Sequence, residues 1–427
     1  MPFLVAVALV TFFGCAIGGL DRDAARAMTA VAQGALALAV IALPRTRTAV
    51  FDWLKRFSTP AALYAALLMQ AAIMSGAFWF GAADTPYRAE QALVGLAGLG
   101  LFFVSVAGAT TAAGRNRMLA ALLWIPLVLA ALTILDWLDG RGDFFGLVAP
   151  SADNRVSGPF ADPNEAATAF ALFAVFGAFA AMDELTRRPA QGAPPLPALT
   201  RRLFLPAASV VASLNMLALS GSRAGIASGV AGLAVYFFIA WRRGQKGRAG
   251  PQIAPIVAGS VAVLALLVAI TSGGGAMRRY AAASDDVKYY ASVTKAAVGA
   301  WTDKPIFGHG LGAYDLLPAS ADGAPFDALR WLAEAGIVGT ALIAAALGML
   351  LWSLWRADDH GRKPSRGFAL AAGLLTTALV HGAATSAMAS PPAAGVLAAL
   401  LGIATAYIDP LGAAMKVKAT ARTRVLG

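Results

Sequence analysis

A single arginine, Arg223, interrupts the apolar stretch LNMLALSGSRAGIASGV from Leu214 to Val230. A charge in lipid costs roughly 3 kcal/mol or more, so we expect this side chain near a membrane face, pointing between helices packed through the neighbouring small residues. A guanidinium group stays charged and donates two parallel hydrogen bonds to phosphate oxygens. At that depth the pattern predicts a lipid-linked diphosphate as the ligand. The alternative is an interfacial arginine that reaches the lipid headgroups.

Further cations lie in two polar stretches. In NRVSGPFADPNEAATAF, from Asn154 to Phe170, Arg155 precedes Pro163 and Asn164, which open an apolar run. Acidic residues flank this start, where a helix presents its positive end, so a well-capped helix explains the stretch equally well. A later polar stretch holds further candidate phosphate ligands, which solvation explains as well: Arg278, Arg279, Lys288 and Lys295.

Three residues are candidates for a general base that takes the proton from an acceptor hydroxyl group. His309 lies in GHGLG, where glycines permit a close backbone approach, and an imidazole titrates near neutral pH. Asp327 and Glu334 lie with Arg330 in PFDALRWLAEAG at i, i+3 and i+7, on one helix face. That face either meets the arginines proposed to bind phosphate, or holds an internal ion pair and a surface acid. A solvent-exposed turn is the alternative for His309.

The sequence lacks the motifs of nucleotide hydrolysis and zinc chemistry. The sequence has no Walker A pattern, no H-E-x-x-H and no dinucleotide fingerprint, and His309, His360 and His381 have no metal-ligand spacing. Cys15 is the only cysteine, which excludes an internal disulfide or a cysteine-based metal cluster. We therefore expect no metal and no cofactor. An ionisable residue within a span, such as His381, is a functional candidate in principle, but a hydrogen-bonded packing role is the simpler interpretation.

The elements that position these residues are expected to be membrane helices. Hydrophobic residues make up 59% of the 427 residues and charged residues 13%. Both fractions differ strongly from the usual composition of soluble proteins. Mean hydropathy is +0.67. The net charge of +11 comes from short basic clusters between apolar runs, so membrane topology explains it better than nucleic-acid binding.

The chain contains about 12 apolar runs of membrane-spanning length, which predicts an all-α polytopic membrane protein. The first run lacks a basic leader and an A-x-A-like site, so we expect a retained span. The Lys and Arg bias predicts that both termini are cytoplasmic and that Arg223 faces outward. The runs lie near 2–19, 27–44, 60–81, 90–110, 118–137, 163–183, 203–221, 224–241, 252–271, 336–355, 367–388 and 392–410.

One outer connection is long enough to carry structure of its own. It runs from Ser272 to Ala335, between the ninth and tenth spans, and contains two helix-like pieces separated by the glycine-rich turn FGHGLGAYD. Loops of that length are usually functional. The predicted organisation is therefore spans one to nine over residues 1–271, a helical periplasmic loop over 272–335, and spans ten to twelve with a cytoplasmic tail over 336–427.

Three patterns in order along the chain resemble the O-antigen ligase and Wzy-type polysaccharide polymerase superfamily of bacterial membrane glycosyltransferases. NRVSGPFADPNEAA is similar to the family's Arg, Gly-x-Phe and Pro-Asn run that opens a span. ALSGSRAG is similar to its Ser-Arg-Gly/Ala element at the outer end of a span. KPIFGHGLGAY followed by WLAEAGIVG is similar to its Pro-x-x-Gly-x-Gly turn and later Glu-x-Gly-x-x-Gly motif. The resemblance covers roughly residues 120 to 405.

The resemblance implies a GT-C-type enzyme of the bacterial inner membrane that uses an undecaprenyl-diphosphate-linked glycan at the periplasmic face. Its implied partners are that donor, a glycan or lipid acceptor, the bilayer and polysaccharide assembly proteins, with no nucleic acid. Ligases of this family carry a His-Asn pair where this chain has Pro325 and Phe326. Lys288 also stands where the family tends to place an arginine. We therefore place polymerisation of a surface or exopolysaccharide ahead of ligation to lipid A core.

Two other classes fit parts of the sequence. A transporter for lipid-linked saccharides would also use many spans and arginines in a cavity, but it predicts polar residues at mid-bilayer depth on several spans. Here nearly all ionisable groups lie at span ends, with His381 the main exception. A scaffold in an assembly complex would not depend on Arg223.

Overall fold

The computed structural model describes residues 42–75, 102–103, 105–109, 111–138, 155–160, 162–186, 196–244, 283–310, 313–317, 326–356, 365–385 and 391–407. Within these ranges the secondary structure is helical, without strands. Five of the described helices are long and apolar enough to cross a membrane. They are α6 (Ala112–Leu138), α7 (Pro163–Thr186), α8 (Leu196–Ser220), α9 (Arg223–Gly244) and α13 (Asp327–Arg356). The predicted class of a multi-pass helical membrane protein is confirmed.

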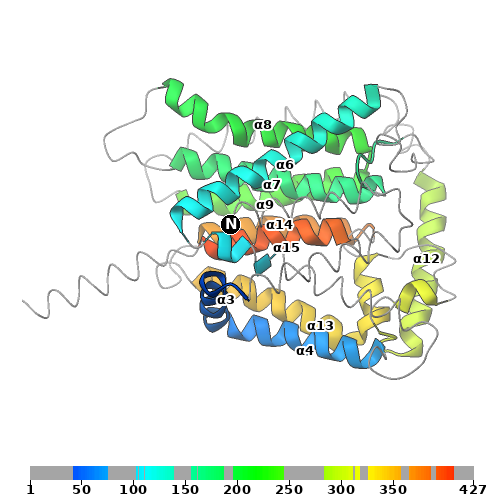
Figure 1. Cartoon of the computed structure of the whole chain (residues 1–427). Coiled ribbons are helices and arrows are strands. Elements are labelled where there is room, and N and C mark those ends of the chain that lie inside the picture. The colour runs from blue at the N-terminus through cyan, green and yellow to red at the C-terminus, as the bar shows by residue number, and fades with distance from the viewer. Residues whose placement is uncertain are drawn as a thin grey trace, which may run out of the picture.

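Three further helices run beside these five in Figure 1: α4 (Ser58–Ser75), α14 (Arg366–Gly382) and α15 (Pro391–Ala406). The runs predicted at 2–19 and 252–271 lie outside the described residues, and the run at 27–44 lies almost wholly outside them. The count of twelve spans therefore stays a prediction.

Two helices lie across the bundle, one at each end. Figure 1 shows α12 (Ala283–Asp303) at one end and α3 (Pro44–Arg56) at the other. The helix predicted within DDVKYYASVTKAAVGAW is present as α12. We call these the α12 end and the α3 end. Helices α7, α9, α13 and α15 begin at the α12 end, and α4, α6, α8 and α14 begin at the α3 end.

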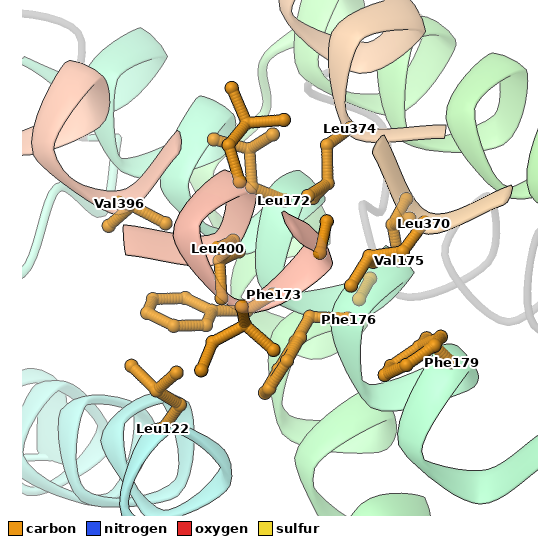
Figure 2. Close-up of a cluster of buried hydrophobic side chains, with 14 of the residues drawn as sticks. Leu122, Leu172, Phe173, Val175, Phe176, Phe179, Leu370, Leu374, Val396 and Leu400 are labelled. Carbon is orange, nitrogen blue, oxygen red and sulfur yellow. The ribbon is translucent and has the colours of Figure 1, made fainter. Parts of the chain in front are cut away.

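Helix α7 forms the centre of the core. It is apolar on all sides, as a helix surrounded by other helices must be, and it packs against α8, α9, α14 and α15. Phe170, Phe173 and Phe176 are fully buried along it. Figure 2 shows Phe173 and Phe176 among leucines from α6, α14 and α15. This packing fixes where the first turn of α7 lies.

Small residues bring α9 and α14 close together. A Cβ atom added to Gly232 would overlap Thr377 Oγ1, and one added to Gly373 would lie 2.9 Å from Tyr236 Cβ. In a membrane, where hydrophobic attraction between helices is weak, such close backbone contact is a main source of association. The approach places the second turn of α9 against the last turn of α14.

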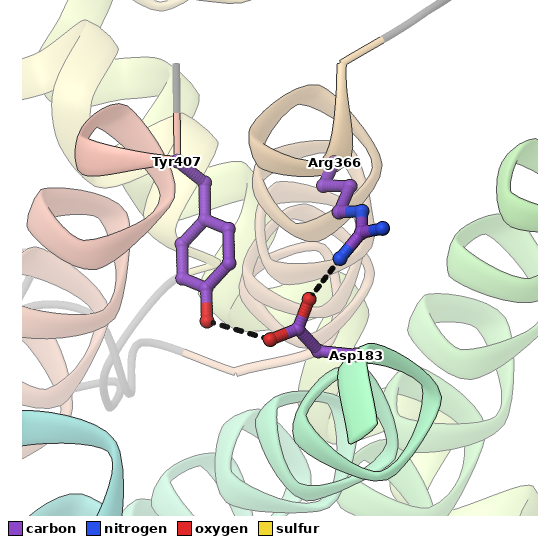
Figure 3. A network of polar contacts seen from close by, with 3 residues as sticks. All are labelled: Asp183, Arg366 and Tyr407. Atoms are coloured by element: carbon purple, nitrogen blue, oxygen red, sulfur yellow. Dashed lines mark hydrogen bonds and ion pairs between the residues drawn. The ribbon is translucent and has the colours of Figure 1, made fainter. Parts of the chain in front are cut away.

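A polar network joins helix ends at the α3 end (Figure 3). Arg366 of α14 forms an ion pair with the buried carboxylate of Asp183 on α7, and the Tyr407 hydroxyl donates to Asp183 Oδ2 at 3.2 Å. The guanidinium of Arg115, on α6, lies 4.9 Å from the centre of the Tyr407 ring. These contacts hold α7 and α14 in place at the α3 end, and the opposite ends of the same two helices carry Asn164 and His381.

Candidate functional site

Arg155 is held by the junction between α8 and α9. Its Nε donates to the Ser220 carbonyl oxygen at 2.8 Å, and its Nη2 donates to Asn164 Oδ1 at 3.0 Å. Gly221, with a φ of 60°, turns the chain sharply at this point. Because Ser220 ends α8 and Asn164 lies in the first turn of α7, Arg155 ties two helix ends together at the α12 end.

Arg223 is the first residue of α9, and its neighbour Ser222 joins the same network. The Ser222 hydroxyl donates to Asn164 Oδ1 at 2.9 Å and accepts from the Gly225 backbone N–H at 3.1 Å, so it caps α9. Arg223 itself is half-buried. Arg155 is therefore joined through Asn164 to Ser222, the residue just before Arg223, so the two arginines that the sequence singled out lie at the same positively polarised helix start.

The side-chain oxygen of Asn164 links Arg155 to Ser222. We therefore predict that removing this acceptor destabilises the protein. Asn164→Ala leaves donors of Arg155 and Ser222 without that oxygen, which costs about 1–3 kcal/mol for a buried polar group. We expect a lower melting temperature in detergent. Asn164→Asp keeps an acceptor oxygen for both donors and is expected to melt close to wild type. An alanine variant as stable as wild type would contradict this role.

Helix α13 is broken at Gly336, where φ is 64° and ψ is −171°. We call residues Pro305–Gly310 the docking turn, because they fill this break. The backbone N–H groups of His309 and Gly310 donate to the carbonyls of Ala333 and Glu334, at 2.9 and 2.8 Å. In return, Ile337 and Val338 donate to the carbonyls of Pro305 and Ile306, at 2.9 and 3.1 Å.

Two glycines make this docking possible. Gly308 and Gly336 both have positive φ, and their backbones cross. A Cβ atom on Gly308 would overlap the Glu334 carbonyl, and one on Gly336 would overlap the Ile306 carbonyl. The two glycine motifs noted in the sequence therefore form one structural unit, which sequence spacing alone did not reveal.

The first segment of α13 buries the charged face predicted there. Arg330 Nε donates to Glu334 Oε1 at 2.9 Å, and both side chains are less than a tenth exposed. The internal ion pair, one of the two alternatives for this face, is present between Arg330 and Glu334, but the remaining acid, Asp327, does not lie at the surface. Asp327 is also buried, and its backbone N–H donates to the Thr385 carbonyl at 3.2 Å.

The side chain of Asp327 lies against the end of α14. A Cβ atom on Gly382 would come within 2.7 Å of Asp327 Oδ2. The adjacent residue, His381, is fully buried, and its Nδ1 lies 3.3 Å from Ser228 Oγ of α9. The sequence favoured a packing role for His381, and the serine contact agrees with it. His381 precedes Gly382, which contacts Asp327, and this proximity of His381 to Asp327 is visible only in the tertiary structure.

His309 fixes the docking turn to α12. Its Nε2 lies 2.8 Å from the carbonyl oxygen of Ala300. Because a carbonyl only accepts, this contact assigns the proton to Nε2. Only Nδ1 is then left to act as a base, so this contact favours a positioning role.

The remaining candidates are only partly placed. Arg278 and Arg279 lie outside the described residues, as does the side chain of Lys288, whose backbone belongs to α12. The described residues contain no group of three or more His, Cys, Asp or Glu side chains able to hold a metal ion.

Residues 208–344 match the family model described as O-antigen ligase. The match runs from within α8 to within α13, and it includes Arg223, the docking turn and Glu334. Arg155 and His381 lie outside the matched residues. No curated protein matches the chain.

Proposed function

We propose that this membrane protein is a glycosyltransferase that polymerises undecaprenyl-diphosphate-linked oligosaccharides, and the match of residues 208–344 to the O-antigen ligase family model supports this. The observation that carries the proposal is that Arg155 is hydrogen-bonded to the α8–α9 junction, where Arg223 begins α9, so that two arginines lie at one helix start. The donor diphosphate is the group that such a cationic site fits, at the depth where a lipid carrier presents it.

In this proposal the two arginines hold the diphosphate as it leaves. The acceptor hydroxyl oxygen attacks the anomeric carbon of the donor sugar, the bond from that carbon to the diphosphate oxygen breaks, and undecaprenyl diphosphate departs. Fixed positive charge stabilises the negative charge that develops on the leaving group. Arg278, Arg279 and Lys288 are proposed as further contacts to it.

We assign the general base to Asp327. It lies on the same segment of α13 as Arg330 and Glu334, two residues after the position where ligases of the family carry histidine. The contact of Glu334 Oε1 with Arg330 Nε gives that carboxylate a role in holding Arg330, and the contact of His309 Nε2 with the Ala300 carbonyl gives that imidazole a positioning role. In this scheme Asp327 takes the acceptor proton, Glu334 orients Arg330, and His309 positions the docking turn.

Polymerisation is preferred to ligation because Pro325 and Phe326 replace the family's His-Asn pair. The family description itself favours the second candidate, transfer of the glycan to lipid A core. In a deletion strain, loss of long chains while single units still reach the core indicates a polymerase. Loss of all glycan from the core indicates a ligase.

Replacing Arg223 tests the proposed role of its charge. We expect Arg223→Ala to insert normally but to lose glycan chain length, with lipid-linked repeat units accumulating on the periplasmic side. Removal of one fixed transition-state donor typically lowers kcat about 10²–10³-fold. Gel analysis of the glycan and extraction of lipid-linked units measure both effects.

Arg242→Ala is the matched control, because Arg242 is an exposed arginine at the other end of the same helix. It is expected to leave chain length unchanged. Unaltered polymer in the Arg223 variant would favour a scaffold, and repeat units trapped on the cytoplasmic side would favour a transporter.

A further inference from the structure

The second segment of α13 is just long enough to cross the hydrocarbon core. It runs from Ile337 to Arg356, and 20 helical residues at about 1.5 Å each span about 30 Å, which equals the thickness of a bilayer core. Trp352 and Trp355 are exposed near its far end, with the Arg356 guanidinium 4.5 Å from the Trp352 ring centre. Tryptophan and arginine mark a membrane interface. Ile337 therefore lies at the opposite boundary of the core.

The docking turn is tied to this boundary by backbone hydrogen bonds. At the start of a helix the first N–H groups lack partners within the helix, and lipid offers none. The carbonyls of Pro305 and Ile306 accept from Ile337 and Val338 at that point. Ile306 and Phe307 must consequently lie at the depth of Ile337.

These residues present apolar surface outward. Ile306, Phe307 and Ile337 are 55%, 49% and 56% exposed. All three residues belong to the one junction that these backbone hydrogen bonds form. Several large apolar side chains exposed at one junction indicate a contact with another apolar phase. The span they adjoin is itself little buried within the protein, since its buried residues are Gly339, Ala346, Leu350 and Leu354.

We propose that Ile306, Phe307 and Ile337 form a lipid-contacting patch that inserts the docking turn into the acyl chains of the leaflet at the α12 end. The patch holds α12 and the Arg330–Glu334 pair at the bilayer surface. This proposal needs a membrane span but not the glycosyltransferase activity.

Spin-label accessibility in lipid nanodiscs tests the patch on the full chain. After replacement of the single cysteine (Cys15→Ser), a label at Ile306→Cys is expected to be more accessible to oxygen than to a water-soluble nickel chelate. It should resemble a label at Val128→Cys, which is exposed midway along α6. A label at Thr302→Cys, exposed on α12, should show the reverse.

Phe307→Cys provides a second probe if the first variant does not fold. An Ile306 label that behaves like the Thr302 label would overturn the proposal by placing the turn in water. A label shielded from both reagents would overturn it as well, because a second copy or a protein partner would then cover the patch. Glycan synthesis is not the readout, so failure here leaves the proposed function standing.

Discussion

Replacing Gly336 by alanine is expected to destabilise the protein by about 3 kcal/mol or more and to abolish glycan extension. With φ of 64° and ψ of −171°, Gly336 occupies a backbone region that is essentially restricted to glycine and costs another residue of order 1–3 kcal/mol, and overpacking adds typically 1–3 kcal/mol. Here the new Cβ would overlap the Ile306 carbonyl, so the docking turn would have to move. Thermal unfolding in detergent and a glycan profile measure the two effects.

Gly348→Ala is the matched control. Gly348 lies on the same helix, but among the described residues no atom from beyond its own stretch of helix lies within 4 Å of the position that its Cβ would take. Alanine there should be neutral or raise stability, by up to about 1 kcal/mol, through helix propensity. Gly308→Ala should reproduce the Gly336 defect, because its Cβ would overlap the Glu334 carbonyl. Equal stability of the Gly336 and Gly348 variants would refute the crossing.

Removal of one partner of the Arg330–Glu334 pair is the second large effect. Glu334→Ala leaves a guanidinium group in a buried position, and breaking a buried ion pair in this way costs about 3–5 kcal/mol. We expect a marked fall in melting temperature and loss of polymer. Arg330→Ala should behave similarly, since it strands the carboxylate.

The double variant Arg330→Met/Glu334→Leu separates structure from chemistry. Apolar replacement of both partners often restores stability, so we expect the double variant to recover much of the loss but to remain without polymer. Recovery of both stability and polymer would reduce the pair to a structural role.

Much of the helical framework could be predicted from the sequence, because long apolar runs have few alternatives in a bilayer. The run predicted at 163–183 became α7, and the helix predicted within DDVKYYASVTKAAVGAW became α12. Both rest on local patterns. The positions of Arg155 and Arg223 at the α12 end likewise follow from where the runs begin and end.

The contacts between distant segments could not be predicted. Nothing local indicates that Asn164 accepts from both Arg155 and Ser222, or that Gly308 crosses Gly336. Glu334 was an open case, because spacing gives a helix face but not what covers it. Asp327 on that face lies against the end of α14, which is distant in the sequence. The docking of residues 305–310 depends on backbone groups that residue types do not specify.

The most direct test is turnover of a purified lipid-diphosphate-linked oligosaccharide by the full-length protein in liposomes, followed together with release of the lipid diphosphate. The account predicts that the wild-type protein produces longer glycans with matching release of lipid diphosphate, and that Arg223→Ala loses both about 10²-fold or more. An Arg223→Ala protein that consumes the donor at the wild-type rate would contradict it.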